Sequence, residues 1–305
     1  MSATYREGEP LRFSLASPDA LSPGLLAHAR GVFGSACRDV VESSPRVGSV
    51  RAVSLFGRAE RDGPLAALDG ELRGPALALG VDCALIRGDL AVGGPRLIVS
   101  DVDSTFIHGE VIEMLAEVAG SVELVSDITA RAMAGELDFA QSLTERVATL
   151  RGVPESALAD VASGVVAVTG ADLLVSAAHA NGARVGLVSG GFHEVVDVVG
   201  ARLGVDDVLA NRLEVADGRL TGRVLGPIVT RAAKAEALER WAARHGIALD
   251  QTVAMGDGAN DLDMMELAGL SIAVMAKQVV LERADAAITH PRLDIAVALF
   301  GWDGA

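Results

Sequence analysis

The spacing of apolar and polar residues along the chain changes at about residue 96. After this point, short apolar runs alternate with longer amphipathic stretches, as strands alternate with helices in α/β proteins. The expected strands are residues 97–101, 184–191, 208–211, 252–258, 271–276 and 286–290. This alternation predicts an α/β fold with a doubly wound, mostly parallel sheet.

Two stretches interrupt that alternation and are read as insertions. Residues 110–165 are helical in pattern, contain no convincing strand and are too long for a simple crossover. We expect them to form a helical cap above the sheet. Residues 214–224 carry Asp-Gly between two alternating segments, which is typical of a β-hairpin.

A smaller unit precedes residue 96. Its pattern predicts the order strand, helix, strands, helix, strand, which suggests a small α+β domain. The corresponding ranges are 11–16, 22–34, 47–59, 64–79 and 81–86. The glycine-rich stretch 88–95 is the best boundary, so we expect a domain over 1–95 and a second domain over 96–305.

Composition narrows the class of protein. Half of the 305 residues are hydrophobic, so the chain can bury a substantial core, and the net charge of −15 disfavours nucleic acid and anionic membranes. Two cysteines are too few for a disulfide framework or a zinc site. We find no apolar leader and no apolar run long enough to span a membrane, so we expect a cytoplasmic protein.

Charged and hydroxyl side chains collect at the expected strand ends. Asp101 and Asp103 follow the first strand, Ser189 follows the second, and Asp257 follows the fourth. Ligands of open α/β sheets bind at this edge. The three carboxylates predict a hard divalent cation, most plausibly Mg²⁺. Ser189 and Lys234, one of only two lysines in the chain, would hold an anion beside it.

A metal, an anion cradle and a spare carboxylate together indicate phosphoryl transfer. Asp101 can serve as the nucleophile, because carboxylates form aspartyl-phosphate intermediates. Asp103 can protonate the leaving alkoxide and then take a proton from the hydrolytic water.

Four motifs carry a resemblance to a known family. They are D-x-D-S-T at 101–105, S-G-G at 189–191, the lone Lys234 and G-D-G-A-N-D at 256–261. Together they resemble the haloacid dehalogenase superfamily of phosphatases. The cap segments AMAGELDF (132–139) and SLTERVATL (142–150) narrow the similarity to the phosphoserine phosphatases. The resemblance covers about 97–295. It implies Mg²⁺-dependent hydrolysis of O-phospho-L-serine, the last step of L-serine biosynthesis.

The resemblance also implies a role for each matching residue. Asp101 would be the nucleophile and Asp103 the general acid/base. Mg²⁺ would be bound by Asp101, the backbone carbonyl of Asp103, and Asp257. The residues expected to bind phosphate are Ser189, Gly190, Lys234 and Asn260. The residues expected to contact the rest of the substrate are Glu110 at the ammonium, Arg146 at the carboxylate, and Met133 and Phe139 at the apolar side.

Other readings stay open at this stage. One is a phosphatase or phosphotransferase of the same fold that acts on phosphohomoserine or another small phosphate. Another is an amino-acid-binding regulator that has kept the fold without turnover, although such a protein has no need of Asp103. The N-terminal unit resembles a degenerate ACT domain, which implies amino-acid binding or pairing into a homodimer; a plain spacer is the alternative.

Overall fold

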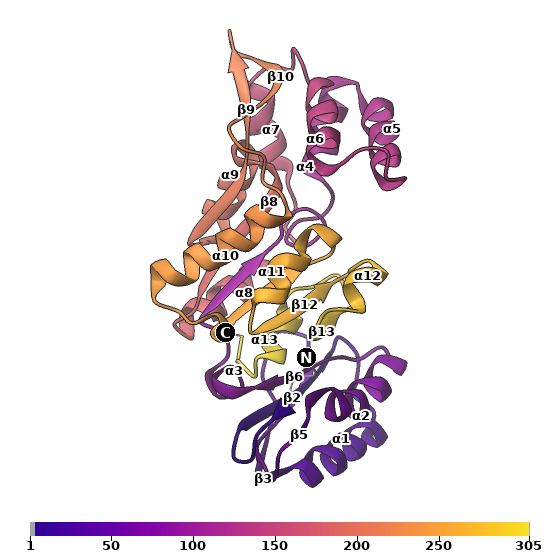
Figure 1. The fold of residues 1–305 in the computed structure, drawn as a ribbon, viewed down its shortest axis with the longest axis vertical. Helices are drawn as coiled ribbons and strands as arrows, with labels where there is room; N and C mark the ends of the chain where they lie inside the picture. The colour runs from indigo at the N-terminus through magenta and orange to yellow at the C-terminus, as the bar shows by residue number, and fades with distance from the viewer. Residues whose placement is uncertain (1–3, 305) are drawn as a thin grey trace.

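The computed structural model describes residues 4–304, and its central feature is a parallel sheet buried on both faces (Figure 1). The strands of this sheet, in spatial order, are β9 (Asp207–Ala216), β8 (Arg184–Phe192), β7 (Leu97–Ser100), β11 (Thr252–Gly256), β12 (Leu270–Val274) and β13 (Ala286–Ile288). All neighbours in this series pair in parallel. The predicted doubly wound α/β fold is confirmed.

The short apolar runs form strands because both of their faces are covered. Successive residues of β7 alternate between two separate core clusters, with Leu97 and Val99 in one and Ile98 in the other. Helices cover both faces, so these strands need no polar side, as is usual for parallel sheets. The helices are α8 (Ala171–Ala180), α9 (His193–Leu203), α10 (Arg231–His245), α11 (Leu262–Leu267), α12 (Gln278–Leu281) and α13 (Asp294–Leu299), with 3₁₀ turns η1 (Leu249–Gln251) and η2 (Ala259–Asp261).

The predicted cap lies at one end of this main unit, as Figure 1 shows. Its helices are α4 (Val111–Ala119), α5 (Val122–Met133), α6 (Phe139–Ala148) and α7 (Ser156–Gly164). Local sequence sets their ends. Gly120 terminates α4 in the left-handed conformation at φ 66°, and Asp138 with Gln141 forms a capping box that starts α6.

The predicted hairpin is present, but it is not a separate insertion. β9 begins in the parallel sheet and continues beyond it to pair antiparallel with β10 (Arg219–Leu225). Asp217 and Gly218 both have positive φ, 52° and 70°, in the turn between them. The hairpin also supports the cap, since Gly152 N donates to Leu220 O at 2.9 Å.

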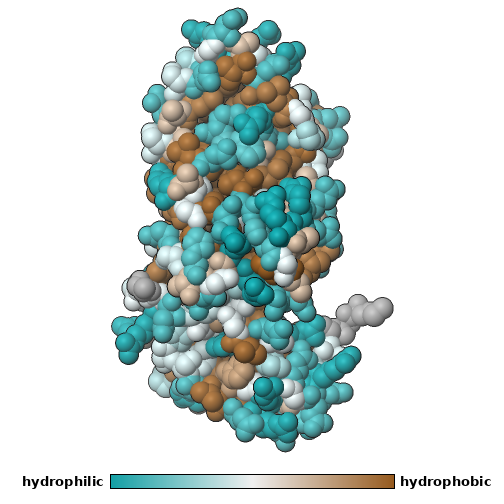
Figure 2. Space-filling view, turned by 90° about the vertical axis from the view of Figure 1, so that its left-hand side faces the viewer, coloured by the Kyte–Doolittle hydropathy of each residue, from teal (hydrophilic) through white to brown (hydrophobic). Residues whose placement is uncertain are grey.

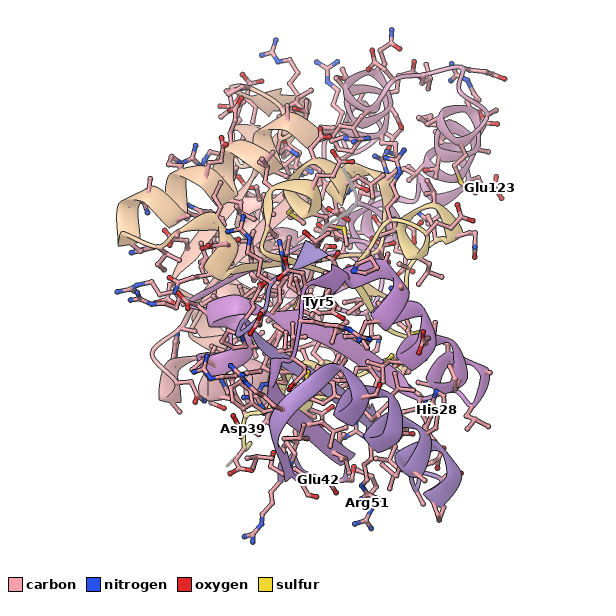
Figure 3. All side chains as sticks on the ribbon, turned by 60° about the horizontal axis from the view of Figure 1, so that its bottom comes forward. Tyr5, His28, Asp39, Glu42, Arg51 and Glu123 are labelled. Carbon is pink, nitrogen blue, oxygen red and sulfur yellow. The ribbon has the colours of Figure 1, made fainter. Side chains whose placement is uncertain are left out.

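Residues 4–87, called the N-terminal unit below, form an antiparallel sheet with two helices on one face (Figure 3). Its elements are β2 (Pro10–Ser17), α1 (Pro23–Ala36), β3 (Cys37–Ser43), β4 (Arg51–Ala59), α2 (Leu65–Ala78) and β6 (Asp82–Arg87), and β1 (Thr4–Tyr5) pairs separately with β5 (Gly63–Pro64). The predicted α+β arrangement is therefore present. The sequence pattern missed β3, whose exposed edge carries polar residues such as Asp39 and Glu42.

The two units share one sheet across the expected boundary. Cys83 of β6 pairs antiparallel with Ala287 of β13, which joins the sheets into eleven strands. A short helix, α3 (Gly88–Gly93), stands in the glycine-rich stretch that the sequence suggested as a boundary. The N-terminal unit therefore extends the main sheet.

The molecular surface is mixed in polarity. On the face shown in Figure 2, exposed apolar patches lie in the upper half, which holds the cap and the β9–β10 hairpin in Figure 1. Val198 of α9 and Leu225 of β10 are among the exposed apolar side chains. Within residues 4–304, no helix combines the length and the apolar character needed to cross a membrane.

Candidate active site

A buried lysine joins two aspartates at the carboxyl edge of the sheet. Lys234 Nζ donates to Asp101 Oδ1 at 2.6 Å and to Asp261 Oδ1 at 2.7 Å, and its side chain is 1% exposed. Thr230 caps the first turn of α10 by accepting from Ala233 N, which fixes the helix that carries the lysine. Burial lowers the pKa of Lys234, but the two carboxylates outweigh burial and raise the pKa overall.

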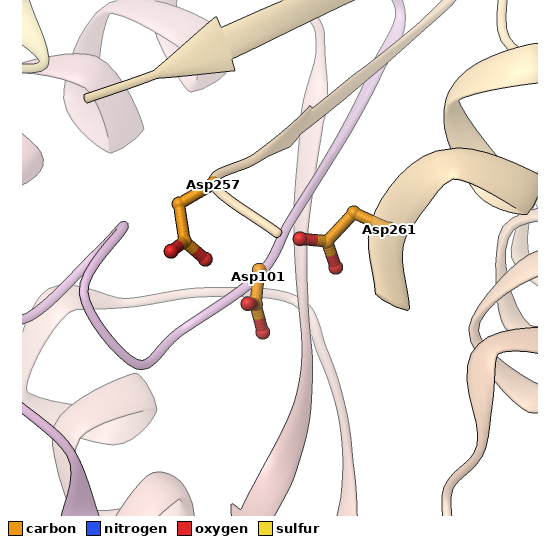
Figure 4. Close-up of side chains that lie close together, drawn as sticks. All are labelled: Asp101, Asp257 and Asp261. Carbon is orange, nitrogen blue, oxygen red and sulfur yellow. The ribbon is translucent and has the colours of Figure 1, made fainter. Parts of the chain in front are cut away.

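Asp101, Asp257 and Asp261 form an acidic cluster (Figure 4). Each offers a carboxylate oxygen, and these oxygens lie within 4.8 Å of one another. Within residues 4–304, no other side chain donates a hydrogen bond to the Asp257 carboxylate, and its nearest cation is Lys277 Nζ at 4.0 Å. Burial and the charge of Asp101 raise the pKa of Asp257. A half-buried carboxylate that accepts no hydrogen bond from another side chain, beside a second carboxylate, fits a hard divalent cation.

The cluster differs from the three carboxylates that the strand ends suggested, whereas the metal set that the resemblance implied, with the backbone carbonyl of Asp103, stays a prediction. Asp261 takes part in it, and the carboxylate of Asp103 does not. Asp103 Oδ1 accepts from Val111 N at 2.7 Å, and Oδ2 accepts from Ser189 Oγ at 2.9 Å. The side chain of Asp103 is therefore held by the start of α4 and by β8. Its backbone carbonyl is the group of Asp103 that could bind a metal.

The environment of Asp103 favours its protonated form. Burial, with the charges of Glu110 and Asp101, raises the pKa of Asp103 to about 7, against the opposing hydrogen bonds. Gly191 is required beside it, because a Cβ at that position would lie 2.9 Å from both Asp103 Oδ2 and Ser189 Oγ. A carboxyl group of this pKa can give and take a proton near neutral pH.

A pocket of about 150 Å³ lies above these groups, between the sheet and the cap. Its lining residues are Asp101, Asp103, Glu110, Ile112, Phe139, Leu143, Arg146, Gly190, Gly191, Asp257, Asn260 and Lys277. The cap thus contributes both apolar walls and charged groups, and the sheet edge contributes the carboxylates. The pocket is large enough for a small metabolite.

Two opposite charges face this pocket without pairing to each other. Glu110 Oε1 accepts from Ser104 Oγ at 3.1 Å, and no ion pair joins Glu110 to Arg146 within the part of the chain that the structure describes. Burial raises the pKa of Glu110 and lowers the pKa of Arg146. Both groups are partly desolvated, so each favours a ligand of opposite charge.

The structure brings most of the residues named from the sequence to this pocket, with three exceptions. Lys234 does not line the pocket, but its Nζ donates to Asp101, which does. Ser189 is fully buried and does not line the pocket; its hydroxyl donates to Asp103 and accepts from Gly191 N at 2.7 Å. Met133 ends α5 and is 79% exposed, outside the pocket, so the apolar side is formed by Phe139 together with Ile112 and Leu143.

Sequence reasoning gave too little weight to two residues. Asp261 belongs to the acidic cluster itself, and Lys277 lies at the pocket, 67% exposed. A signal for Lys277 was available, because it is the second of two lysines in a chain that otherwise uses arginine. Asp261 was marked as the last residue of the G-D-G-A-N-D motif, which predicts that it orients Lys234 or a metal-bound water. The hydrogen bond from Lys234 Nζ to Asp261 Oδ1 at 2.7 Å agrees with the first of these roles.

Comparison with known proteins places the chain among enzymes. Residues 98–266 match the haloacid dehalogenase-like hydrolase family. The phosphoserine phosphatase SerB2 of Mycobacterium tuberculosis is 50% identical over 221 residues, 72% of this chain and 54% of that protein. The chain thus spans about half the length of that relative. The phosphoserine phosphatase of Streptococcus thermophilus is 53% identical over 197 residues, 65% of this chain and 92% of that protein.

Solved structures extend the similarity to both units. A probable phosphoserine phosphatase from Vibrio cholerae matches 95% of this chain and 86% of its own, with a TM-score of 0.74 and 33% identity. A second solved structure is a phospho-aspartyl intermediate analogue of a phosphoserine phosphatase. It matches 65% of this chain and 95% of its own, with a TM-score of 0.61 and 41% identity. The chain therefore belongs to the haloacid dehalogenase-like hydrolases and, among them, to the phosphoserine phosphatase family.

Proposed function

We propose that this protein is a phosphoserine phosphatase, which hydrolyses O-phospho-L-serine to L-serine and phosphate. The observation that carries the proposal is a single pocket that holds Glu110 and Arg146, unpaired, beside the Asp101–Lys234 pair. The substrate has an ammonium, a carboxylate and a phosphate. An acid suits the ammonium, and an arginine fork suits the carboxylate.

The first chemical step transfers the phosphoryl group to the protein. Asp101 Oδ attacks phosphorus while the bond between phosphorus and the serine oxygen breaks, and Asp103 donates its proton to that oxygen. The products are L-serine and an aspartyl phosphate at Asp101. The raised pKa of Asp103, about 7, keeps a proton available for this donation near neutral pH.

The second step restores the enzyme. Asp103, now ionised, takes a proton from a water molecule as the water oxygen attacks phosphorus. The bond between phosphorus and Asp101 breaks, and inorganic phosphate leaves. Lys234 stays protonated throughout, because its raised pKa lies far above neutrality, and it holds Asp101 in place through both steps.

The acidic cluster would hold the cofactor, which we take to be Mg²⁺. Asp101, Asp257 and the backbone carbonyl of Asp103 would bind it, and when bound it would neutralise charge on the phosphate. Asp261 has a positioning role beside it, since its carboxylate accepts from Lys234 and from Gly258 N at 3.1 Å. For the phosphate itself, we assign Lys234, Asn260 and Gly190, with Ser189 acting through its bond to Asp103.

Substrate profiling tests the proposal. Phosphate release is measured from phosphoserine, phosphohomoserine, phosphothreonine and phosphoethanolamine, with Mg²⁺ and with EDTA. We expect Mg²⁺-dependent preference for phosphoserine, loss of turnover in Asp101→Asn, and a raised KM in Glu110→Gln and Arg146→Gln. Preference for phosphohomoserine would keep the mechanism and refute the substrate. No release from any ester would favour a regulator that binds without turnover.

The variants also separate recognition from chemistry. Phosphoethanolamine lacks the carboxylate, so Arg146→Gln should leave its turnover unchanged while Glu110→Gln lowers it. A matched control is Arg151→Gln, which removes an exposed arginine of the cap outside the pocket. If Arg151→Gln affected phosphoserine as strongly as Arg146→Gln, recognition of the carboxylate by Arg146 would be wrong.

We also propose that the chain works as two domains. Residues 1–95 would form an ACT-like domain and residues 96–305 the phosphatase domain with its cap. The Vibrio cholerae structure, which matches 95% of this chain, supports an N-terminal unit attached to the enzyme in this way.

A further inference from the structure

The strand next to β11 brings a second lysine to the active-site pocket. β12 pairs in parallel with β11, with Ala273 opposite Gly256, so the segments after both strands leave the sheet at the edge where ligands bind. The segment after β11 carries Asp257 and Asn260, and the segment after β12 carries Lys277. All three side chains line the pocket of about 150 Å³. Lys277 therefore lies where a bound ligand would meet it.

The backbone that carries Lys277 has an uncommon conformation. Met275, two residues earlier, has φ 46°, in the left-handed region that residues other than glycine rarely adopt. Two hydrogen bonds fix this turn, from Met275 N to Ile288 O at 2.8 Å and from Lys277 N to Asp257 O at 3.0 Å. The second bond joins the lysine to the segment after β11. Strained backbone persists where the surrounding structure determines it, and it is concentrated at functional sites.

The ammonium of Lys277 has donors to spare. Its nearest acid is Asp257, at 4.0 Å between Nζ and Oδ2, and within the part of the chain that the structure describes Nζ donates no hydrogen bond. Lys234 differs, because its Nζ already donates to Asp101 and Asp261, at 2.6 and 2.7 Å. A ligand can therefore use every N–H of Lys277, whereas two of those of Lys234 are taken.

The charges of the pocket favour a second cation for the phosphate. The charged lining residues are the acids Asp101, Asp103, Glu110 and Asp257 and the cations Arg146 and Lys277. A phosphate monoester adds a charge of about −1.5 to −2 at pH 7. Arg146 is assigned to the substrate carboxylate, so Lys277 is the lining cation that remains for the phosphate.

We propose that Lys277 is a further substrate-binding residue, whose ammonium binds the phosphate of the ester from the rim of the pocket. This inference rests on the proposed phosphatase function and adds a residue to it. The side chain is 67% exposed, so it can turn from Asp257 toward a bound phosphate. A compact ammonium suits this contact, because it acts as a point charge without a fixed plane.

The use of lysine in the chain supports the same conclusion. Lysine and arginine together number 26, and only two of these residues are lysines. Both lie beside the acidic cluster, Lys234 against Asp101 and Lys277 near Asp257. The site thus has one buried lysine that holds the nucleophile and one exposed lysine that is available to the substrate.

Titration calorimetry of the full chain with inorganic phosphate, at two MgCl₂ concentrations, tests the contact without turnover. We expect Lys277→Gln to weaken phosphate binding about tenfold or more at both, because a hydrogen bond to a charged group is lost. Lys277→Arg keeps the charge and should restore most of the affinity. The matched control is Arg283→Gln, which removes an exposed cation of the following segment that lies outside the pocket, 3.7 Å from Glu266.

Kinetics separate recognition of the phosphate from recognition of the carboxylate. Lys277→Gln should raise KM by the same factor for phosphoserine and for phosphoethanolamine, which lacks the carboxylate. Arg146→Gln should raise KM for phosphoserine alone. We expect kcat of Lys277→Gln to change less than KM, because the contact is made in the bound substrate and is kept during transfer.

Four results would overturn the inference. Equal phosphate affinity in wild type and Lys277→Gln would exclude the contact. An equal loss in Arg283→Gln would show a general effect of net charge. A loss that disappears at the higher MgCl₂ concentration would show that Lys277 acts on the metal site. A raised KM for phosphoserine alone would place Lys277 at the carboxylate.

Failure of the proposed function would look different. A chain that releases no phosphate from any ester refutes that function, whereas the titration still measures whether Lys277 binds phosphate. A chain that hydrolyses phosphoserine, with equal phosphate affinity in wild type and Lys277→Gln, refutes the role of Lys277 alone.

Discussion

Replacement of Lys234 by methionine is the sharpest test of the site's electrostatics. The ammonium is 1% exposed and bridges Asp101 and Asp261 at 2.6 and 2.7 Å. Methionine has similar length and keeps the packing, but it leaves both carboxylates buried without their cation. Removing one partner of a buried ion pair costs about 3–5 kcal/mol. We therefore expect the free energy of unfolding to fall by about that amount at pH 8.

The chain supplies its own matched control. Lys277 is the other lysine, 67% exposed and 4.0 Å from Asp257, so Lys277→Met removes the same charge from a solvated pair. Exposed pairs contribute about 0–1 kcal/mol. Urea unfolding in EDTA buffer, followed by the fluorescence of the buried Trp241 and Trp302, measures both variants without a metal ion that could replace the ammonium.

The pH dependence adds a second test of the same variant. Burial and the charge of Asp101 raise the pKa of Asp261 to about 7, above the ordinary value of 3.8. A raised carboxyl pKa means that the folded state binds the proton more tightly, so stability rises as pH falls from about 7 toward 4. Loss of the Lys234 ammonium raises the pKa of Asp261 further. The free energy of unfolding that Lys234→Met loses at pH 8 should therefore be partly regained at low pH. Equal stability of the two lysine variants at pH 8 would refute the reasoning.

Three further predictions concern other residues. Asp103→Asn should abolish turnover, because it removes the group that transfers the proton. Burial raises the pKa of Asp103 to about 7, so the same variant should be more stable than wild type in EDTA at pH 8, by as much as about 4 kcal/mol. Urea unfolding should show no such gain near pH 4, where the carboxyl is protonated in both the folded and the unfolded chain. Burial also raises the pKa of Cys37 to about 11 and of Cys83 to about 12, so neither should react with Ellman's reagent at pH 8 until guanidinium unfolds the chain; rapid reaction of native protein would contradict this. Gly186→Ala would place a Cβ 2.5 Å from the Trp241 ring, and we expect a loss of about 1–3 kcal/mol in urea unfolding; an unchanged midpoint would show that the ring can move aside.

Much of the catalytic edge could be predicted because strand ends converge in a parallel sheet. Asp101 follows β7, Ser189 lies near the end of β8, and Asp257 follows β11, so a linear pattern of apolar runs was enough to place them near one another. The hairpin turn at Asp217–Gly218 was equally local, since its residue types favour the positive φ values that the turn needs.

Other features depend on partners distant in sequence. β3 has exposed, largely polar residues and becomes a strand because β4 pairs with it, with Val41 opposite Phe56. The exposed position of Met133 follows from where α5 ends, and motif similarity could not give it. The eleven-stranded sheet depends on contact between β6 and β13, two strands about 200 residues apart.

The sequence by itself determined most of the elements, the fold class and the identity of the reactive groups, because these follow from local periodicity and from residue types at strand ends. The tertiary structure alone decided how those groups are paired. Lys234 lies between Asp101 and Asp261, and Ser189 binds the carboxylate of Asp103 while Glu110 and Arg146 stay unpaired. Burial and charge contacts across distant segments set the proton affinities, and neither can be read from residues in their linear order.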